Sequence, residues 1–401
     1  MSRIELLAPA GDLERLKVAV RYGADAVYLG GKQFSLRTRA SNFTLDDIQA
    51  GVAFAHGHDA RVHVTVNMIP HEEDFNGLEA YLKALESIGV DAIIVASYAI
   101  MKLAKQVAPS LEVHVSTQHS STNSAAIAFW AKEGMDRVVL AREYTMAQIQ
   151  ETCKHSSLPV EVFVHGGMCI AYSGRCMLSN YMTGRDANRG GCAQSCRWNY
   201  RLYDDHEAVY SDKEMFSMGS KDLCAIDYIP ALVDAGVRSL KIEGRMKSQY
   251  YLATIVRAYR MCIDAYCAYG YIPKETMRLG KEELAKAENR ESSIGFYGGS
   301  PQSDGHLYGG NGLKANQDYL AEVVDYDAKT KIATLRVRNN FSSNMACEAF
   351  GPHLENTRFT MPTLYDEEEK IVEVANKPMA ILHAKIEIDL HAYDMIRKIR
   401  G

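Results

Sequence analysis

Residues 92–142 read AIIVASYAIMKLAKQVAPSLEVHVSTQHSSTNSAAIAFWAKEGMDRVVLAR, and this stretch contains the pattern that decides the fold. Short apolar runs rich in Val and Ile begin at Ala92, Leu111 and Arg137. The segments between them carry apolar residues three and four positions apart, which indicates helices. Short, nearly continuous apolar runs that alternate with helices are typical of a parallel sheet covered on both faces.

The same alternation continues through the first 270 residues. Strand-like runs begin at Ile4, Ala26, Arg61, Ala92, Leu111, Arg137, Val160 and Ser239. Eight strand–helix units are the number that closes a barrel. We therefore predict a (β/α)8 barrel over residues 1–270. An open doubly wound sheet shows the same alternation and is the alternative.

The composition of the 401 residues, 47% hydrophobic and 24% charged, is that of a globular protein and excludes disordered and fibrous classes. The net charge of −5 means that a polyanionic partner would need a local basic patch. No apolar run approaches the roughly 20 residues that span a bilayer, and the first residues lack the layout of a signal peptide. We expect a cytoplasmic protein with no membrane partner.

The alternation of strands and helices is interrupted once, by a long loop that comprises residues 168–218. The loop is rich in Gly, Ser, Asn and Arg, and it separates the seventh strand from a helix-like segment that starts at Lys221. Loops of this length are usually functional, and loops that follow barrel strands build the active-site face. Four of the nine cysteines lie in it: Cys169, Cys176, Cys192 and Cys196.

The cysteine spacing is C-x6-C-x15-C-x3-C, which indicates a metal site more than a disulfide framework, because cytosolic thiols stay reduced. Structural zinc sites favour two short C-x2–4-C pairs, and only the second pair fits that rule. Iron–sulfur clusters accept thiolates from irregular spacings. The spacing favours an iron–sulfur cluster and leaves a zinc site and a redox thiol pair open.

The same loop also reverses the charge of the chain. Between Met168 and Arg201 the only charged residues are Asp186 and five arginines: Arg175, Arg185, Arg189, Arg197 and Arg201. Arginine suits phosphates and carboxylates, and interleaved rings such as Trp198 offer stacking surfaces for bases. Alternatively, the arginines neutralise the thiolates and pack against the barrel rim.

Polar residues at the carboxyl ends of the other strands are expected to form a cup for an anionic small molecule above an apolar barrel. We assign catalytic roles to Glu243, Arg245 and His165, with Arg245 as a carboxylate clamp. We assign substrate binding to Arg142, Arg175, Arg185, Asn67 and Gln118.

The remaining chain changes in character. Residues 271–319 contain a charged helical segment and a Gly-rich stretch, which we interpret as a linker. From residue 320 to 401 the pattern alternates between apolar and polar, as in LAEVVDYDAKTKIATLRVRNNF, and predicts a small β-barrel domain. This domain contains no catalytic motif that we recognise, so we expect it to position the substrate.

The stretch EVFVHGGMCIAYSGRCMLSNYMTGRDANRGGCAQSCRWNY, from Glu161 to Tyr200, resembles the signature of the peptidase U32 family. The segments LAPAG near the start and KIEGRMKSQYY from Lys241 resemble the same family. The resemblance covers essentially the whole chain. Gly167 is one departure, since the family motif usually has Ser or Ala there.

The resemblance implies a tRNA-modifying enzyme that converts the wobble uridine of tRNA to 5-hydroxyuridine. It further implies a [4Fe–4S] cluster held by Cys169, Cys176, Cys192 and Cys196, with prephenate as co-substrate. The alternative is a collagenase-like peptidase of the same family, possibly zinc-dependent, although the motifs G-x-S-x-G and H-E-x-x-H are absent from the sequence. A weaker third option is a scaffold that only presents tRNA to another enzyme.

Overall fold

The computed structural model describes residues 4–36, 42–209, 215–287, 290–307 and 318–399. The chain divides into two compact units, Met1–Lys314 and Ala315–Gly401. Each unit has its own hydrophobic core.

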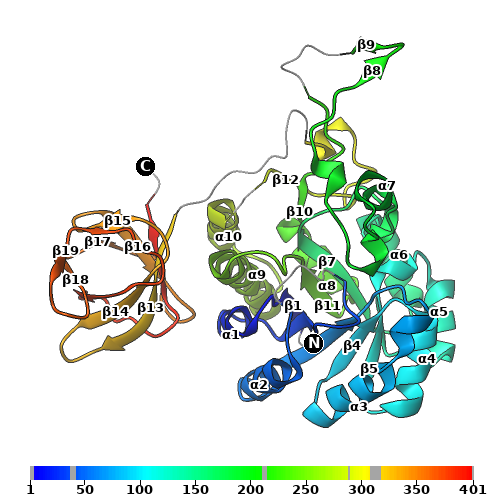
Figure 1. The fold of residues 1–401 in the computed structure, drawn as a ribbon, viewed down its shortest axis with the longest axis horizontal. Coiled ribbons are helices and arrows are strands. Elements are labelled where there is room, and N and C mark those ends of the chain that lie inside the picture. The colour runs from blue at the N-terminus through cyan, green and yellow to red at the C-terminus, as the bar shows by residue number, and fades with distance from the viewer. Residues whose placement is uncertain (1–3, 37–41, 210–214, 288–289, 308–317, 400–401) are drawn as a thin grey trace. The chain divides into compact units, whose positions relative to one another are not determined.

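Eight parallel strands form the centre of the first unit. They are β1 (Glu5–Pro9), β2 (Ala26–Gly30), β3 (Arg61–Val66), β4 (Ala92–Val95), β5 (Glu112–Val115), β6 (Arg137–Val139), β7 (Val160–Gly166) and β11 (Ser239–Ile242). Successive strands pair side by side, and β11 pairs with both β7 and β1. The sheet therefore closes on itself (Figure 1), which confirms the predicted barrel and excludes the open sheet.

Helices follow the strands and cover the outside of the barrel (Figure 1). They are α1 (Leu13–Arg21), α2 (Leu45–His56), α3 (Leu78–Ile88), α4 (Tyr98–Val107), α5 (Ser124–Lys132), α6 (Met146–His155), α8 (Ile229–Asp234) and α9 (Gln249–Tyr269). Side chains cap the first turns of several of these helices: Thr44 forms a capping box with Asp47, and Ser248 accepts the N–H of Tyr251. None of the described helices is long and apolar enough to cross a bilayer.

The segment 271–319 differs from the predicted linker, because its described residues up to 307 belong to the first unit. Helix α10 (Lys274–Ala287) packs against α9, and β12 (Ser292–Ser293) pairs with β10 (Asp222–Cys224). The hydroxyl of Tyr297 donates to the carbonyl of Phe163 in β7 (2.6 Å). Residues 308–317 lie outside the described residues. The apolar groups of this segment thus complete the wall beside β7, and β10 forms a strand where the sequence had predicted a helix.

The interior of the barrel holds a buried network of charges, which differs from the apolar interior expected from the sequence. Lys241 Nζ lies 2.7 Å from one oxygen of Glu161, and Arg137 Nη1 lies 3.1 Å from the other. Arg137 also donates to both oxygens of Glu5. A buried charge without a partner is costly, so these opposite charges must be present together.

The second unit is an antiparallel sheet curved into a half-barrel. Its strands are β13 (Tyr319–Asp327), β14 (Ile332–Val337), β16 (Ala346–Phe350), β17 (Thr357–Thr360), β18 (Leu364–Tyr365), β19 (Ile371–Val372), β21 (Ile381–Lys385) and β22 (Met395–Lys398), in the order β17-β16-β22-β13-β14-β21-β18-β19. Strands β15 (Phe341–Ser342) and β20 (Val374–Ala375) pair separately. Strands β13 and β14 form the hairpin that the alternation predicted.

Replacing Glu161 by Gln is expected to lower the free energy of unfolding by about 3–5 kcal/mol, because Lys241 loses a buried partner. Urea denaturation at pH 7 measures this change. Glu79→Gln, in an exposed pair with Lys83 at 2.6 Å, is the control and should cost at most about 1 kcal/mol. A loss of similar size in both variants would contradict the role of the network.

Acid should weaken the same network. Burial alone would raise the pKa of Glu161, but the charges of Lys241 and Arg137 outweigh it and lower the pKa from 4.5 to about 2. A carboxyl with a lowered pKa in the folded state contributes its stability above pH 4.5, and that contribution is lost as the pH falls toward 2. Unfolding curves between pH 5 and 2 should show a steeper loss of stability for the wild type than for Glu161→Gln.

Candidate active site

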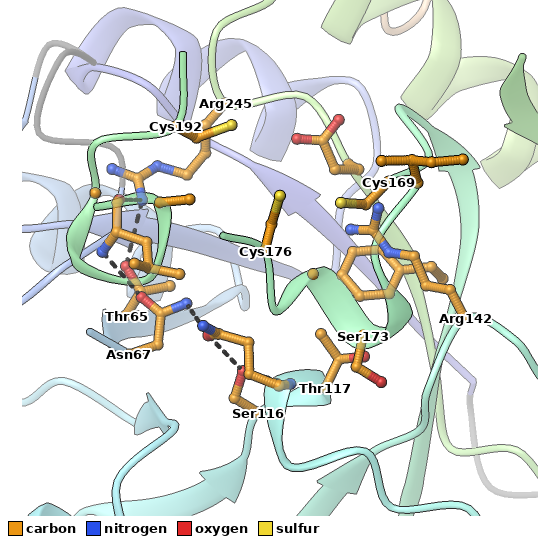
Figure 2. Close-up of a pocket in the computed structure, with 18 of the residues that line it drawn as sticks. Thr65, Asn67, Ser116, Thr117, Arg142, Cys169, Ser173, Cys176, Cys192 and Arg245 are labelled. Carbon is orange, nitrogen blue, oxygen red and sulfur yellow. Dashed lines mark hydrogen bonds between the residues drawn. The ribbon is translucent and has the colours of Figure 1, made fainter. Parts of the chain in front are cut away.

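A cavity of about 210 Å³ lies where the strands end and the cysteine-rich loop begins (Figure 2). The barrel brings nine of the predicted site residues to it. These are Asn67, Gln118, Arg142, Cys169, Cys176, Cys192, Cys196, Glu243 and Arg245. The carboxyl ends of parallel strands meet at one face of a barrel, which explains why residues from distant parts of the chain share one cavity.

The loop itself consists of short pieces: η3 (Tyr172–Gly174), α7 (Leu178–Thr183), η4 (Ala187–Arg189), η5 (Ser195–Arg197) and the hairpin of β8 (Tyr203–Asp204) and β9 (Glu207–Ala208). Ser173 and Gln194 adopt positive φ angles of 53° and 56°. This conformation is costly for residues other than glycine, so surrounding contacts must hold the loop in shape.

Two arginines supply such contacts. Arg197 donates to the carbonyls of Met168 (3.1 Å) and Ser220 (3.2 Å) and lies 3.6 Å from the carboxylate of Asp222. Arg189 forms an ion pair with Asp74, in the segment after β3. These two arginines therefore hold the loop against the barrel rim. Such packing was part of the alternative interpretation of the loop arginines.

All four loop cysteines are free thiols, and Figure 2 shows the sulfurs of Cys169, Cys176 and Cys192 around the same hollow. Burial raises the pKa of Cys169, and it raises that of Cys196 to about 11. Repulsion from the other thiolates of the set adds to both shifts. All four thiols line the same cavity.

The four thiols are the donors that a metal centre at this cavity could use. Among the described residues, no three His, Cys, Asp or Glu side chains converge closely enough to bind one metal ion. The four thiols are instead distributed around the cavity. A [4Fe–4S] cluster takes one thiolate at each of four irons, so it requires four thiols spaced around it, whereas zinc requires ligands at about 2.3 Å from one point.

Arg245 is held by the protein itself. Its side chain is buried and donates to Ser35 Oγ (3.1 Å), the carbonyl of Leu36 (3.2 Å) and Asn42 Oδ1 (2.7 Å). These partners lie in the segment after β2. The guanidinium therefore holds Ser35, Leu36 and Asn42 in place, and Leu36 lines the cavity. The role of Arg245 as a carboxylate clamp stays a prediction.

Arg142 and Glu243 both contact Gly167, the residue just before the cysteine-rich loop. Arg142 Nη1 donates to the carbonyl of Gly167 (2.5 Å), and Glu243 Oε2 accepts the N–H of Gly167 (3.0 Å). A Cβ at position 167 would lie 3.1 Å from Glu243 Oε2, so a larger residue would press on that carboxylate. Glu243 thus has a positioning contact as well as a place in the cavity wall.

His165 does not line this cavity, although its position in β7 had placed it there. The ladder between β7 and β11 shifts register between Phe163 and His165, and such a bulge turns the following side chain to the opposite face. His165 lies beside Tyr259 of α9, with Nδ1 and the hydroxyl oxygen 3.4 Å apart. Burial, together with the charge of Lys247, lowers the pKa of His165 to about 3, so the ring is neutral at pH 7.

Two other predicted residues also lie away from the cavity wall. Arg175 is exposed and Arg185 is half-buried, both on the cysteine-rich loop. Conversely, the cavity includes Lys241, to which the sequence had given no role, and Glu143, which the sequence had placed at the barrel mouth without a specific role. Glu143 comes directly after Arg142, in the segment that follows the sixth strand. Lys241 lies in β11, at a position whose side chain faces the barrel interior. The position of each residue relative to a strand was therefore the signal that could have identified it as a cavity residue.

A barrel whose mouth carries a four-cysteine loop defines the class of this protein. Residues 11–307 match the model of Peptidase family U32, and residues 315–397 match the Peptidase family U32 C-terminal domain. The chain belongs to the peptidase U32 family.

The relatives carry names of different kinds. The tRNA hydroxylation protein P1 of Bacillus subtilis is 46% identical over 98% of this chain and 94% of its own length. The 23S rRNA 5-hydroxycytidine synthase of Escherichia coli is 42% identical over 66% of this chain and 40% of its own length. A protein named collagenase from Porphyromonas gingivalis is 34% identical over 84% of this chain and 83% of its own length.

Removing the anchor at Arg197 should loosen the loop. Arg197→Ala loses two hydrogen bonds from a charged donor, each worth about 1.5–3 kcal/mol. Chymotrypsin cleavage near Trp198 is therefore expected to accelerate about tenfold or more. Arg175→Ala, at an exposed position on the same loop, is the control. Equal cleavage rates in the two variants would contradict the anchoring role.

Proposed function

We propose that this protein hydroxylates the wobble uridine of tRNA to 5-hydroxyuridine. The observation that carries the proposal is the ring of four free thiols around a cavity at the mouth of the barrel. It is supported by a relative of nearly full length that is named for tRNA hydroxylation.

The proposed cofactor is a [4Fe–4S] cluster held by Cys169, Cys176, Cys192 and Cys196. A bound cluster would supply electron transfer or an electron-poor iron beside the substrate. The arginine anchors would keep its four ligands together, since the loop has little regular structure of its own. The cavity would place the reacting base next to the ligands and away from bulk water.

The outer surface of the loop suits an RNA strand. Tyr172, Tyr181 and Trp198 are exposed, with Tyr181 82% exposed, and Arg175 lies among them in the sequence. Arginines contact phosphates, and exposed rings stack unpaired bases. A base leaves its stack before an enzyme modifies it in a pocket, and the anticodon loop makes that step inexpensive. We propose that the C-terminal domain helps to position the tRNA.

We propose prephenate, an anionic small molecule, as the co-substrate. Arg142 lies in the cavity wall, with its guanidinium 3.8 Å from the centroid of the Phe163 ring. Its Nε is buried and has no hydrogen-bond partner among the described residues. A carboxylate is the ligand that such a cationic donor prefers.

Replacing any one of the four loop cysteines by Ser should remove the cluster. The anaerobically purified protein is expected to be brown and to hold about four irons per chain, and each variant should lose most of that iron. Cys267→Ser, at an exposed position in α9, is the matched control and should keep it. Colourless wild-type protein with stoichiometric zinc would contradict the cluster.

Nucleoside analysis of tRNA tests the function directly. Cells that lack the protein should lose 5-hydroxyuridine and its derivatives, and the wild-type chain should restore them. Cys196→Ser should fail to restore them, whereas Cys267→Ser should succeed. Unchanged tRNA in the deletion strain would refute the proposal, and cleavage of peptides by the purified protein would then favour the peptidase alternative.

A further inference from the structure

Gln118 carries a buried hydrogen-bond donor at the wall of the cavity. Its residue is 4% exposed, and its side chain lies in η2 (Thr117–His119), directly after β5. The amide nitrogen, Nε2, is buried and has no hydrogen-bond partner among the described residues. A buried donor without a partner costs free energy, so a ligand that accepts its hydrogen bond gains affinity.

A chain of hydrogen bonds determines which way the Gln118 side-chain amide is oriented. The backbone N–H of Leu36 can only donate, so the atom of Asn67 that faces it, at 3.1 Å, must be the oxygen Oδ1. The nitrogen of Asn67 then donates to Gln118 Oε1 at 3.3 Å. The hydroxyl of Ser116 donates to the same oxygen at 3.2 Å. Turning the Gln118 amide over would bring two N–H donors face to face at Asn67 Nδ2, so the oxygen stays on that side and Nε2 is left for a ligand.

We propose that Gln118 Nε2 donates to the 4-carbonyl oxygen of a uracil base and makes the cavity selective for uridine over cytidine. This rests on the proposed function and names the residue that sets its base specificity. Uracil presents a carbonyl at position 4, whereas cytosine presents an amino group there. A fixed N–H donor donates a hydrogen bond to the carbonyl but is opposed by the amino group, which is itself a donor. A relative is named for 5-hydroxycytidine, so cytidine is the relevant competitor.

The surroundings favour a neutral base over a carboxylate at this donor. The groups that hold Gln118 in place, Asn67 and Ser116, are uncharged. The unpartnered donor of Arg142 is a guanidinium and so suits an anion better. An amide that donates one directed hydrogen bond distinguishes a carbonyl from an amino group, which charge alone does not.

The test is equilibrium binding of two anticodon-arm RNA hairpins that differ only in U or C at the target position. Fluorescence anisotropy with the full-length, cluster-loaded protein should show about a tenfold or greater preference for the U hairpin. Gln118→Glu replaces the donor by an acceptor and should abolish or reverse the preference. Asn67→Asp should do the same without changing Gln118, because two facing oxygens would repel and turn the Gln118 amide over.

Gln148→Glu, on the surface helix α6, is the matched control, because Glu can replace Gln in its capping box with Thr145. It should keep the wild-type ratio, and thermal melting should show that all variants are folded. Equal binding of the two hairpins by the wild type would overturn the inference about Gln118 but not the proposed function. A loss of prephenate affinity in Gln118→Glu with an unchanged U-to-C ratio would also overturn it, by assigning the donor to the carboxylate. Failure to bind either hairpin would instead count against the proposed function.

Discussion

The pairing of β11 with both β7 and β1 is the constraint on which the site depends. It joins residues about 80 positions apart in the pair with β7 and about 234 apart in the pair with β1. The sheet thereby closes into a barrel, and all eight strands end at one face. The same pairing brings Lys241 to Glu161 in the interior and Glu243 to the N–H of Gly167 at the rim. The barrel interior and the start of the cysteine-rich segment are therefore fixed by one closure.

The loop depends on that frame because it has little regular structure to hold its shape. Its strained residues, Ser173 and Gln194, persist because contacts to the barrel determine the conformation. Arg197 and Arg189 supply those contacts with carbonyl and carboxylate partners, so part of the positive charge of the loop is structural. The arginines at exposed or half-buried positions, Arg175 and Arg185, are left for the proposed RNA contact.

Within the cavity, different groups suit different parts of the proposed substrates. We propose the thiols for the cluster, Arg142 for an anion and Gln118 for a neutral carbonyl. This division follows from how each group is already engaged. The two Nη atoms of Arg245 donate to Ser35, Leu36 and Asn42. Gln118 Nε2 and Arg142 Nε are buried and have no hydrogen-bond partner among the described residues.

The sequence by itself determined the eight strands, the C-terminal hairpin and the identity of the four cysteines, because apolar periodicity and residue spacing are local properties of the chain. It also placed Asn67, Gln118, Arg142 and Glu243 at the cavity, since each follows a strand. Only the tertiary structure decided the rest. The bulge in the ladder beside Phe163 turned His165 outward, a one-residue effect that depends on the partner strand. Residues 274–287 and 290–307 belong to the first unit because they pack against α9 and β7. The contacts of Arg245 include Ser35, which lies 210 positions away in the chain.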